Sequence, residues 1–152
     1  MSEYLQTTVD KFTFRVAKDR LYTPNGLWVM FVQAQGPPRL RIGITDFLQQ
    51  HSGDVAFVTA RPQGTNLKAG DEFADMETMK ITLGLPSPIT GTIVEISPAL
   101  ELKPEVVNQD PYGEGWMAVI EATDWEADRA QLLEAPAYLE VMKALAEKEL
   151  ES

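Results

Sequence analysis

The chain of 152 residues contains no cysteine and a single histidine, His51. Without thiols it can form neither disulfides nor thiolate metal sites, and it has no cysteine nucleophile. A histidine-based zinc site or a Ser-His-Asp triad would need His51 as its sole imidazole, and neither an H-x-x-H nor a G-x-S-x-G pattern surrounds it. We therefore expect His51 to be a surface or helix-capping residue. The sequence indicates no catalytic residues and no metal site.

Basic residues and long apolar runs are also scarce. The chain has 13 lysines and arginines against 23 aspartates and glutamates, which gives a net charge of -10. This charge repels phosphate backbones and anionic lipids, so neither nucleic acid nor a membrane is an expected partner. No apolar run approaches bilayer length, and residues 1–4 lack the basic start and apolar core of a signal peptide. We expect a cytoplasmic protein.

Short strand patterns separated by turn residues fill the first four-fifths of the chain. They predict strands over residues 8–16, 27–33, 40–44, 54–58, 73–79, 81–85, 92–96 and 117–121. Residues 45–50 predict a short helix that Thr45 or Asp46 caps and Gly53 ends. From Trp125 onward, apolar residues recur at helical spacing with an interruption at Pro136, which predicts two amphipathic helices covering the sheet.

Two of these strands flank the tetrapeptide Glu77-Thr78-Met79-Lys80. Apolar residues alternate with polar or small ones after Lys80 and are interspersed with them before it, which predicts a hairpin with this lysine at its tip. The prolines and glycine of residues 86–91 end the second strand. A turn lysine is ordinarily a solvated charge. At the tip of a hairpin in a small acidic domain, however, it is also where a carrier protein would bear a prosthetic group.

Three stretches, in this order, resemble the lipoyl-carrier H-proteins of the glycine cleavage system. They are residues 41–47 running into 53–58, the Lys80 hairpin with residues 88–91, and residues 107–116. The run Asp110-Pro111-Tyr112-Gly113-Glu114-Gly115-Trp116 is the most specific of them. The resemblance covers residues 20–145, nearly the whole chain.

The resemblance implies a mainly β fold: a lipoyl/biotinyl-type β-sandwich, or barrel-sandwich hybrid, with short flanking helices and C-terminal helices. Residues 1–124 would form the lipoyl domain and residues 125–152 a helical appendage packed on it. It also implies lipoate in amide linkage to Lys80. The protein would then be a carrier component of a multienzyme system and not itself an enzyme. Its implied partners include a lipoate ligase or lipoyl transferase and dihydrolipoamide dehydrogenase.

Two positions depart from the family pattern. In glycine cleavage the arm carries a methylamine, whose cationic amine is held by a glutamate and an aspartate. At the matching positions this chain has Leu27 and Gly84, whose side chains accept no hydrogen bond. Within the family, the chain therefore resembles more the lipoate-binding proteins of sulfur oxidation, and this resemblance implies an arm that carries sulfur intermediates to a heterodisulfide-reductase-like complex. On this interpretation, Leu27→Glu with Gly84→Asp should improve methylamine loading.

Three alternatives stay open. The first is a glycine cleavage H-protein that carries aminomethyl groups between the glycine cleavage enzymes. The second is a biotinyl carrier, because a methionine directly before the lysine, here Met79, is common in biotinyl domains. The third is an unmodified interaction module that uses its acidic surface and C-terminal helices. Modification of Lys80 in the native host discriminates the carriers from the module.

Overall fold

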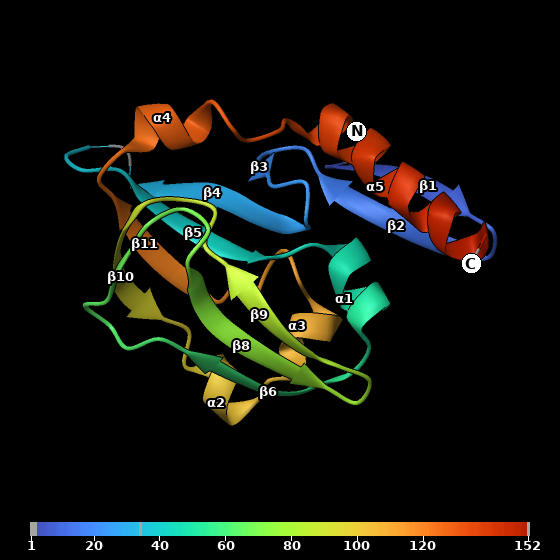
Figure 1. The fold of residues 1–152 in the computed structure, drawn as a ribbon, viewed down its shortest axis with the longest axis horizontal. Coiled ribbons are helices and arrows are strands. Elements are labelled where there is room, and N and C mark those ends of the chain that lie inside the picture. Colours follow the sequence, from blue (N-terminus) through green and yellow to red (C-terminus); the bar gives the residue numbers. More distant parts are fainter. Residues whose placement is uncertain (1–2, 34, 152) are drawn as a thin grey trace.

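The structure is a computed structural model that describes residues 3–33 and 35–151. Its strands form three antiparallel sheets (Figure 1). The large sheet has the order β3 (Leu21–Tyr22), β4 (Leu27–Gln33), β5 (Arg39–Ile44), β11 (Ala118–Ala122), β10 (Gly91–Ile96) and β7 (Asn66–Leu67). The small sheet has the order β6 (Val55–Ala60), β8 (Glu72–Thr78) and β9 (Thr82–Pro86). The third sheet is a hairpin of β1 (Tyr4–Val9) and β2 (Phe12–Ala17).

The large and small sheets share one apolar core. Leu40, Ile42 and Ile120 of the large sheet are fully buried in it, together with Phe73 and Met76 of the small sheet. Burying such side chains is the main contribution to the stability of the sandwich, at about 1.5–3 kcal/mol for each. The arrangement confirms the mainly β sandwich expected from the sequence.

Helix α1 (Asp46–Ser52) forms where the sequence predicts a helix. The Thr45 side chain accepts a hydrogen bond from the backbone N–H of Leu48, so Thr45 is the N-cap. Gly53 ends the helix with φ of 90°, a conformation that a residue with a Cβ rarely adopts. Phe47 and Leu48 of this helix enter two different apolar clusters, so α1 connects them.

Two helices of one turn each, α2 (Ala99–Leu102) and α3 (Val106–Gln109), connect β10 to β11. The sequence did not predict them, because four residues are too few to establish a helical period. Both have buried apolar residues, Leu100 in α2 and Val107 in α3.

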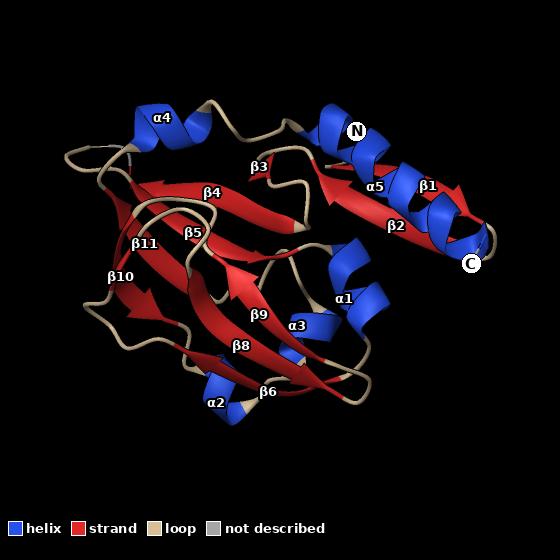
Figure 2. Cartoon of the chain, in the orientation of Figure 1, coloured by secondary structure: helices blue, strands red, loops and turns tan. Residues whose placement is uncertain are grey.

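The helices after the sandwich are α4 (Trp125–Arg129) and α5 (Ala135–Glu151), which lie outside the strands (Figure 2). Two helices are present, as predicted, but the break between them lies at residues 130–134 and not at Pro136. This proline lies in the first turn of α5, where its missing N–H leaves no hydrogen bond unmade. In the segment between the helices, Leu133 and Tyr22 exchange two backbone hydrogen bonds of 2.8 Å.

The predicted single strand over residues 8–16 is also wrong. Val9 pairs with Phe12, and the chain reverses between them at Asp10, whose φ is 56°. Aspartate tolerates this left-handed conformation better than most residues. Helix α5 packs on the resulting hairpin and not mainly on the sandwich: Tyr138 and Met142 share a second apolar cluster with Phe14 and Val16.

The proposed division into a lipoyl domain of residues 1–124 and an appendage of residues 125–152 stays a prediction. Helix α5 shares a core with β1 and β2 from the other end of the chain. Within residues 3–33 and 35–151, none of the helices has the length and hydrophobicity needed to cross a bilayer.

Candidate functional site

Lys80 lies in the short turn between β8 and β9, as the sequence predicts (Figure 1). The hydroxyl of Thr78 organises this turn. Its oxygen accepts hydrogen bonds from the backbone N–H groups of Lys80, at 3.1 Å, and Ile81, at 3.0 Å. The same hydroxyl donates to the carbonyl of Ser52, at 2.7 Å. Thr78 therefore fixes both the shape of the turn and its position beside the end of α1.

The side chain of Lys80 is exposed and runs past Gly53. A Cβ on Gly53 would lie 3.3 Å from Cδ of Lys80, tighter than ordinary van der Waals contact. The glycine thus leaves a path for the aliphatic part of the lysine. Among the residues described, none makes a hydrogen bond or ion pair with the Lys80 amine. An exposed amine without a partner is accessible for acylation.

The side chain of Asn108 connects the backbone segments that lie beside Lys80. Its side-chain oxygen accepts from the backbone N–H of Val55, at 2.8 Å, and its side-chain nitrogen donates to the carbonyl of Gly53, at 2.9 Å. The same nitrogen donates to the side chain of Gln49, at 3.2 Å. This amide therefore joins α1, Gly53 and β6. Asn108 falls in the motif region of residues 107–116, but its sequence position does not reveal this contact.

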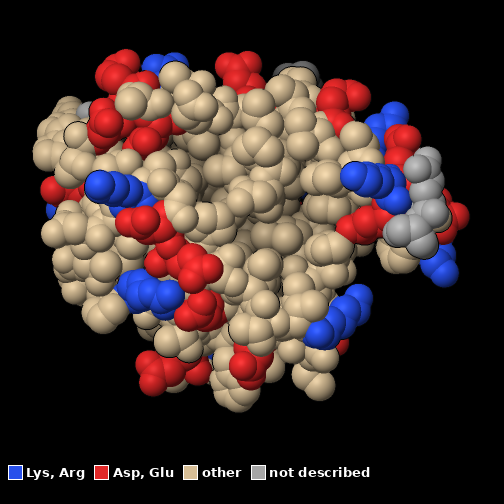
Figure 3. Space-filling view, viewed as in Figure 1, with Lys and Arg blue, Asp and Glu red and all other residues tan. Residues whose placement is uncertain are grey.

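A groove of about 490 Å³ opens beside the lysine, lined by Phe12, Phe14, Phe47, Gln50, His51, Lys80 and Glu149. In Figure 3 the outline of the molecule is indented between its main body and the layer formed by the N-terminal hairpin and α5. The groove walls are mostly aromatic. An aliphatic arm that starts at Lys80 would therefore meet apolar surface, so the residues present fit a lipoyl group attached there.

His51 is half exposed, as expected for a surface residue. Its ring stacks on Phe47 at 5.8 Å between centroids, and Nδ1 lies 2.5 Å from a carboxylate oxygen of Glu149. The pair joins the end of α5 to α1. No sequence pattern relates these two residues, because 97 residues separate them in the chain.

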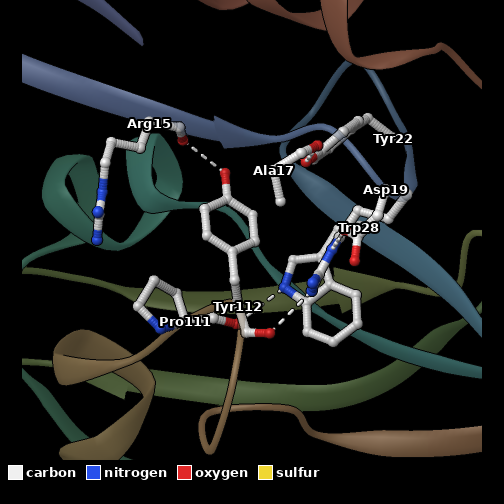
Figure 4. A network of polar contacts seen from close by, with 8 residues as sticks. Arg15, Ala17, Asp19, Tyr22, Trp28, Pro111 and Tyr112 are labelled. Atoms are coloured by element: carbon white, nitrogen blue, oxygen red, sulfur yellow. Dashed lines mark hydrogen bonds and ion pairs between the residues drawn. The ribbon is translucent and has the colours of Figure 1, made fainter. Parts of the chain in front are cut away.

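The Asp110–Trp116 segment has a structural role (Figure 4). The carbonyl of Pro111 accepts a hydrogen bond from the indole of Trp28, at 2.9 Å, and the hydroxyl of Tyr112 donates to the carbonyl of Arg15, at 2.7 Å. Burial raises the pKa of Tyr112 far above its ordinary value. The segment therefore joins the large sheet to the N-terminal hairpin and does not reach the lysine.

The two positions that depart from the family pattern differ in environment. Leu27 is 1% exposed and belongs to the core of the sandwich. A glutamate placed there would bury a carboxylate, so Leu27→Glu would cost stability before it could hold an amine. This makes the double substitution a poor test of cargo binding.

Gly84 lies under a carboxylate from the neighbouring strand. A Cβ on Gly84 would lie 1.7 Å from a side-chain oxygen of Glu72. Arg61 offsets that charge, with Nη2 3.8 Å from Glu72 and Nη1 3.1 Å from Asp75. The sequence alone did not reveal that an acidic side chain occupies this space.

The family model described as "Glycine cleavage H-protein" matches residues 20–145 of the chain. Two curated relatives are glycine cleavage system H proteins. That of Chlorobium limicola is 42% identical over 84% of this chain and 97% of its own length. That of Salinibacter ruber is 44% identical over 81% of this chain and 95% of its own length.

Two further matches extend the comparison. The "Glycine cleavage system H protein 4" of Aquifex aeolicus is 36% identical over 91% of this chain and 78% of its own length. The crystal structure of a glycine cleavage system H protein from Mycobacterium marinum superposes with a TM-score of 0.71 at 29% identity, covering 82% of this chain and 97% of that one. With the matching fold and the lysine hairpin in place, the chain belongs to the glycine cleavage H-protein family.

Proposed function

We propose that this protein is a lipoyl carrier whose lipoate is attached to Nζ of Lys80. The observation that carries the proposal is an exposed lysine at the tip of a hairpin, with no partner among the described residues for its amine, in a chain of the H-protein family. Acyl transfer from an activated lipoate would form an amide with the amine and release the activating group and a proton. When bound, lipoate supplies a cyclic disulfide that opens by reduction or by nucleophilic attack.

The residues of the chain would present this arm and perform no chemistry on the cargo. Thr78 and Asn108 fix the point from which the arm starts, and Gly53 leaves its first carbons unobstructed. A tether of this kind raises the local concentration of the arm at a docked partner, to about millimolar for a short flexible link. The proposed partners are a lipoate ligase, the glycine cleavage enzymes and dihydrolipoamide dehydrogenase. A cytoplasmic location is part of the proposal.

The pathway we propose is glycine cleavage, with the carrier moving aminomethyl groups. Family membership and the names of the curated relatives support it. The carboxylate of Glu72 over Gly84 also weakens the inference that this region has no acidic group for a cationic cargo.

A sulfur carrier for a heterodisulfide-reductase-like complex is the second candidate. The burial of Leu27 favours it, because the position matching the family glutamate lies in the apolar core and has no acceptor for an amine. The two candidates differ in what the arm should accept from its enzymes.

Attachment is tested by a peptide mass spectrum of the protein purified from its own host. We expect a lipoyl adduct on the fragment that contains Lys80 and complete loss of the adduct in Lys80→Arg. Lys68→Arg, which changes another exposed lysine, is the matched control and should retain the adduct. A bare Lys80 in a host that lipoylates other proteins would overturn the carrier and leave the interaction module.

The pathway is tested on the lipoylated protein. Incubation with glycine and the glycine decarboxylase partner should add the mass of the aminomethyl cargo to the Lys80 fragment, and Lys80→Arg should gain nothing. An arm that is lipoylated but gains no mass under these conditions would reject glycine cleavage in favour of the sulfur candidate.

A further inference from the structure

The run of residues 110–116 ends in an aromatic side chain that the proposed carrier function does not use. Trp116 is partly buried, and its backbone N–H donates to the carbonyl of Gly113 at 3.1 Å. The guanidinium of Arg41, on β5, lies over the Trp116 ring at 4.5 Å from its centroid. The most specific stretch of the sequence thus supplies one half of an arginine–tryptophan pair, and a central strand of the large sheet supplies the other.

This pair lies on the outer face of the large sheet. The neighbours of Arg41 along β5, Leu40 and Ile42, are fully buried in the core shared with the small sheet. Successive side chains of a strand point to opposite faces, so Arg41 points away from that core. Lys80 belongs to the hairpin of the small sheet, on the other side of the core. A molecule bound at Arg41 would therefore leave the lysine accessible.

The guanidinium of Arg41 has hydrogen-bond donors without an acceptor. Among the residues that the structure describes, none makes a hydrogen bond or ion pair with it, and its Nε is buried without a partner. Arg39 on the same face differs, because it pairs with Glu121 at 3.0 Å. Glu95 is in register with Val119, one strand further from Arg41, and forms no ion pair with it. An unpaired buried donor costs free energy, which an incoming acceptor would recover.

The surroundings of the guanidinium fit a carboxylate on an aliphatic stem. A guanidinium presents a planar fork of donors that matches the two oxygens of a carboxylate. In the described part of the chain the indole N–H of Trp116 also has no acceptor, so it is a further donor. Met30 on β4 and Val119 on β11 flank Arg41 in the sheet and supply apolar surface. Arginine and tryptophan are enriched among the residues that dominate binding energy at protein interfaces.

We propose that Arg41 and Trp116 form a docking site for a carboxylate side chain of a partner protein. The site goes beyond the proposed carrier function, because it lies on the face away from Lys80. A second copy of the chain is a poor occupant, since two molecules with a net charge of -10 repel each other. The partner surface would be mainly basic, and its one carboxylate at Arg41 would fix the register in which the two proteins meet.

The test titrates the peptide acetyl-Leu-Glu-Leu-amide into the unmodified protein and follows the indole N–H resonance of Trp116 by NMR. We expect a saturable shift in the wild type and binding weaker by about tenfold or more in Arg41→Gln, because hydrogen bonds to a charged group are lost. Arg15→Gln is the matched control. It removes the same charge from an arginine that lies 4.5 Å from the Tyr4 ring, and it should bind the peptide as the wild type does.

The corresponding glutamine peptide, acetyl-Leu-Gln-Leu-amide, tests carboxylate recognition without any substitution in the protein and should give no saturable shift. The indole resonance of Trp28, which is bonded to the carbonyl of Pro111, should be unchanged in Arg41→Gln if the fold is intact. Equal binding of the two peptides, equal binding by the wild type and Arg41→Gln, or no saturable shift in the wild type would each overturn the proposal.

Sedimentation separates a partner protein from a second copy. We expect the wild type to be a monomer. Self-association of the wild type that Arg41→Gln abolishes would make the second copy the occupant and reject the partner protein. All these measurements use the unmodified protein, so they are independent of whether lipoate is attached to Lys80.

Discussion

At the residue scale, Thr78 has a structural role that its position in the sequence does not reveal. Threonine is common in strands, so the sequence gives no sign that its hydroxyl would bridge the lysine turn and the carbonyl of Ser52. Its side chain is largely buried, with 8% exposed. Loss of the hydroxyl would leave the N–H of Lys80 and the carbonyl of Ser52 without this partner.

We expect Thr78→Val to lower the free energy of unfolding by about 1–3 kcal/mol, the cost of leaving buried polar groups unpaired. The turn should also loosen, so lipoate should be attached more slowly. Urea denaturation and the rate of lipoylation by the ligase check the two effects. Thr78→Ser keeps the hydroxyl and serves as control. A valine variant as stable and as quickly modified as the serine variant would contradict the role assigned to Thr78.

The position of Lys80 at a hairpin tip was predictable because local signals converge on it: apolar residues interspersed before it, alternation after it and a proline-rich end to the second strand. The other residues that line the groove were not predictable from the sequence. Phe12 and Glu149 meet near Lys80 only because α5 packs on the N-terminal hairpin. A single sequence carries no signal for such a contact between distant segments.

At the scale of elements, α4 is attached to the turn that follows β9. Asp128 on this helix is 8% exposed, and its carboxylate accepts hydrogen bonds from the backbone N–H of Thr90, at 2.6 Å, and from its hydroxyl, at 3.4 Å. Hydrogen bonds to charged groups contribute more than neutral ones. This contact fixes α4 at the end of the sandwich away from Lys80.

Asp128→Ala should therefore lower the free energy of unfolding by about 1.5–3 kcal/mol. Glu126→Ala is the matched control, because Glu126 lies on the same helix and is exposed. Urea denaturation of both variants measures the difference. Equal stability losses would mean that the Asp128 carboxylate adds nothing beyond helix propensity.

The strands of the sandwich were predictable from alternation, whereas the first hairpin was not. Asp10-Lys11 lacks the glycine, asparagine or proline that usually marks a tight turn, so residues 8–16 have the pattern of one strand. The break between α4 and α5 was predicted at Pro136, a few residues too late, for a different reason. Leu133 pairs with Tyr22 in the segment before this proline, and proline is well tolerated in the first turn of α5.

The whole molecule has two apolar cores, and the second is rich in tyrosine. Tyr22 and Tyr138 stack with 4.6 Å between ring centroids, and the hydroxyl of Tyr138 lies 2.8 Å from that of Thr45. Burial raises the pKa of Tyr138 from 10.0 to about 12, and it raises the pKa values of Tyr22 and Tyr112 as well. The folded protein thus keeps these phenols neutral at a pH at which the unfolded chain ionises them.

Stability should consequently be unaffected by these groups below pH 10 and should fall as the pH rises from there through about 12. The rise in the pKa of Tyr138 alone corresponds to a loss of roughly 3 kcal/mol in the free energy of unfolding across this pH range. Urea denaturation across this range should show the fall, and Tyr138→Phe should reduce its slope because one of the phenols is removed. A pH-independent stability above pH 10 would contradict the burial of these hydroxyls.

The contact between His51 and Glu149 also affects how the protein should be produced. It places the last turn of α5 at the mouth of the groove beside Lys80. An affinity tag or fusion partner appended after that turn would emerge next to Lys80, the proposed site of lipoate attachment. A tag joined ahead of β1 would emerge near the start of α5 instead (Figure 1), so it is the better choice for preparing lipoylated material.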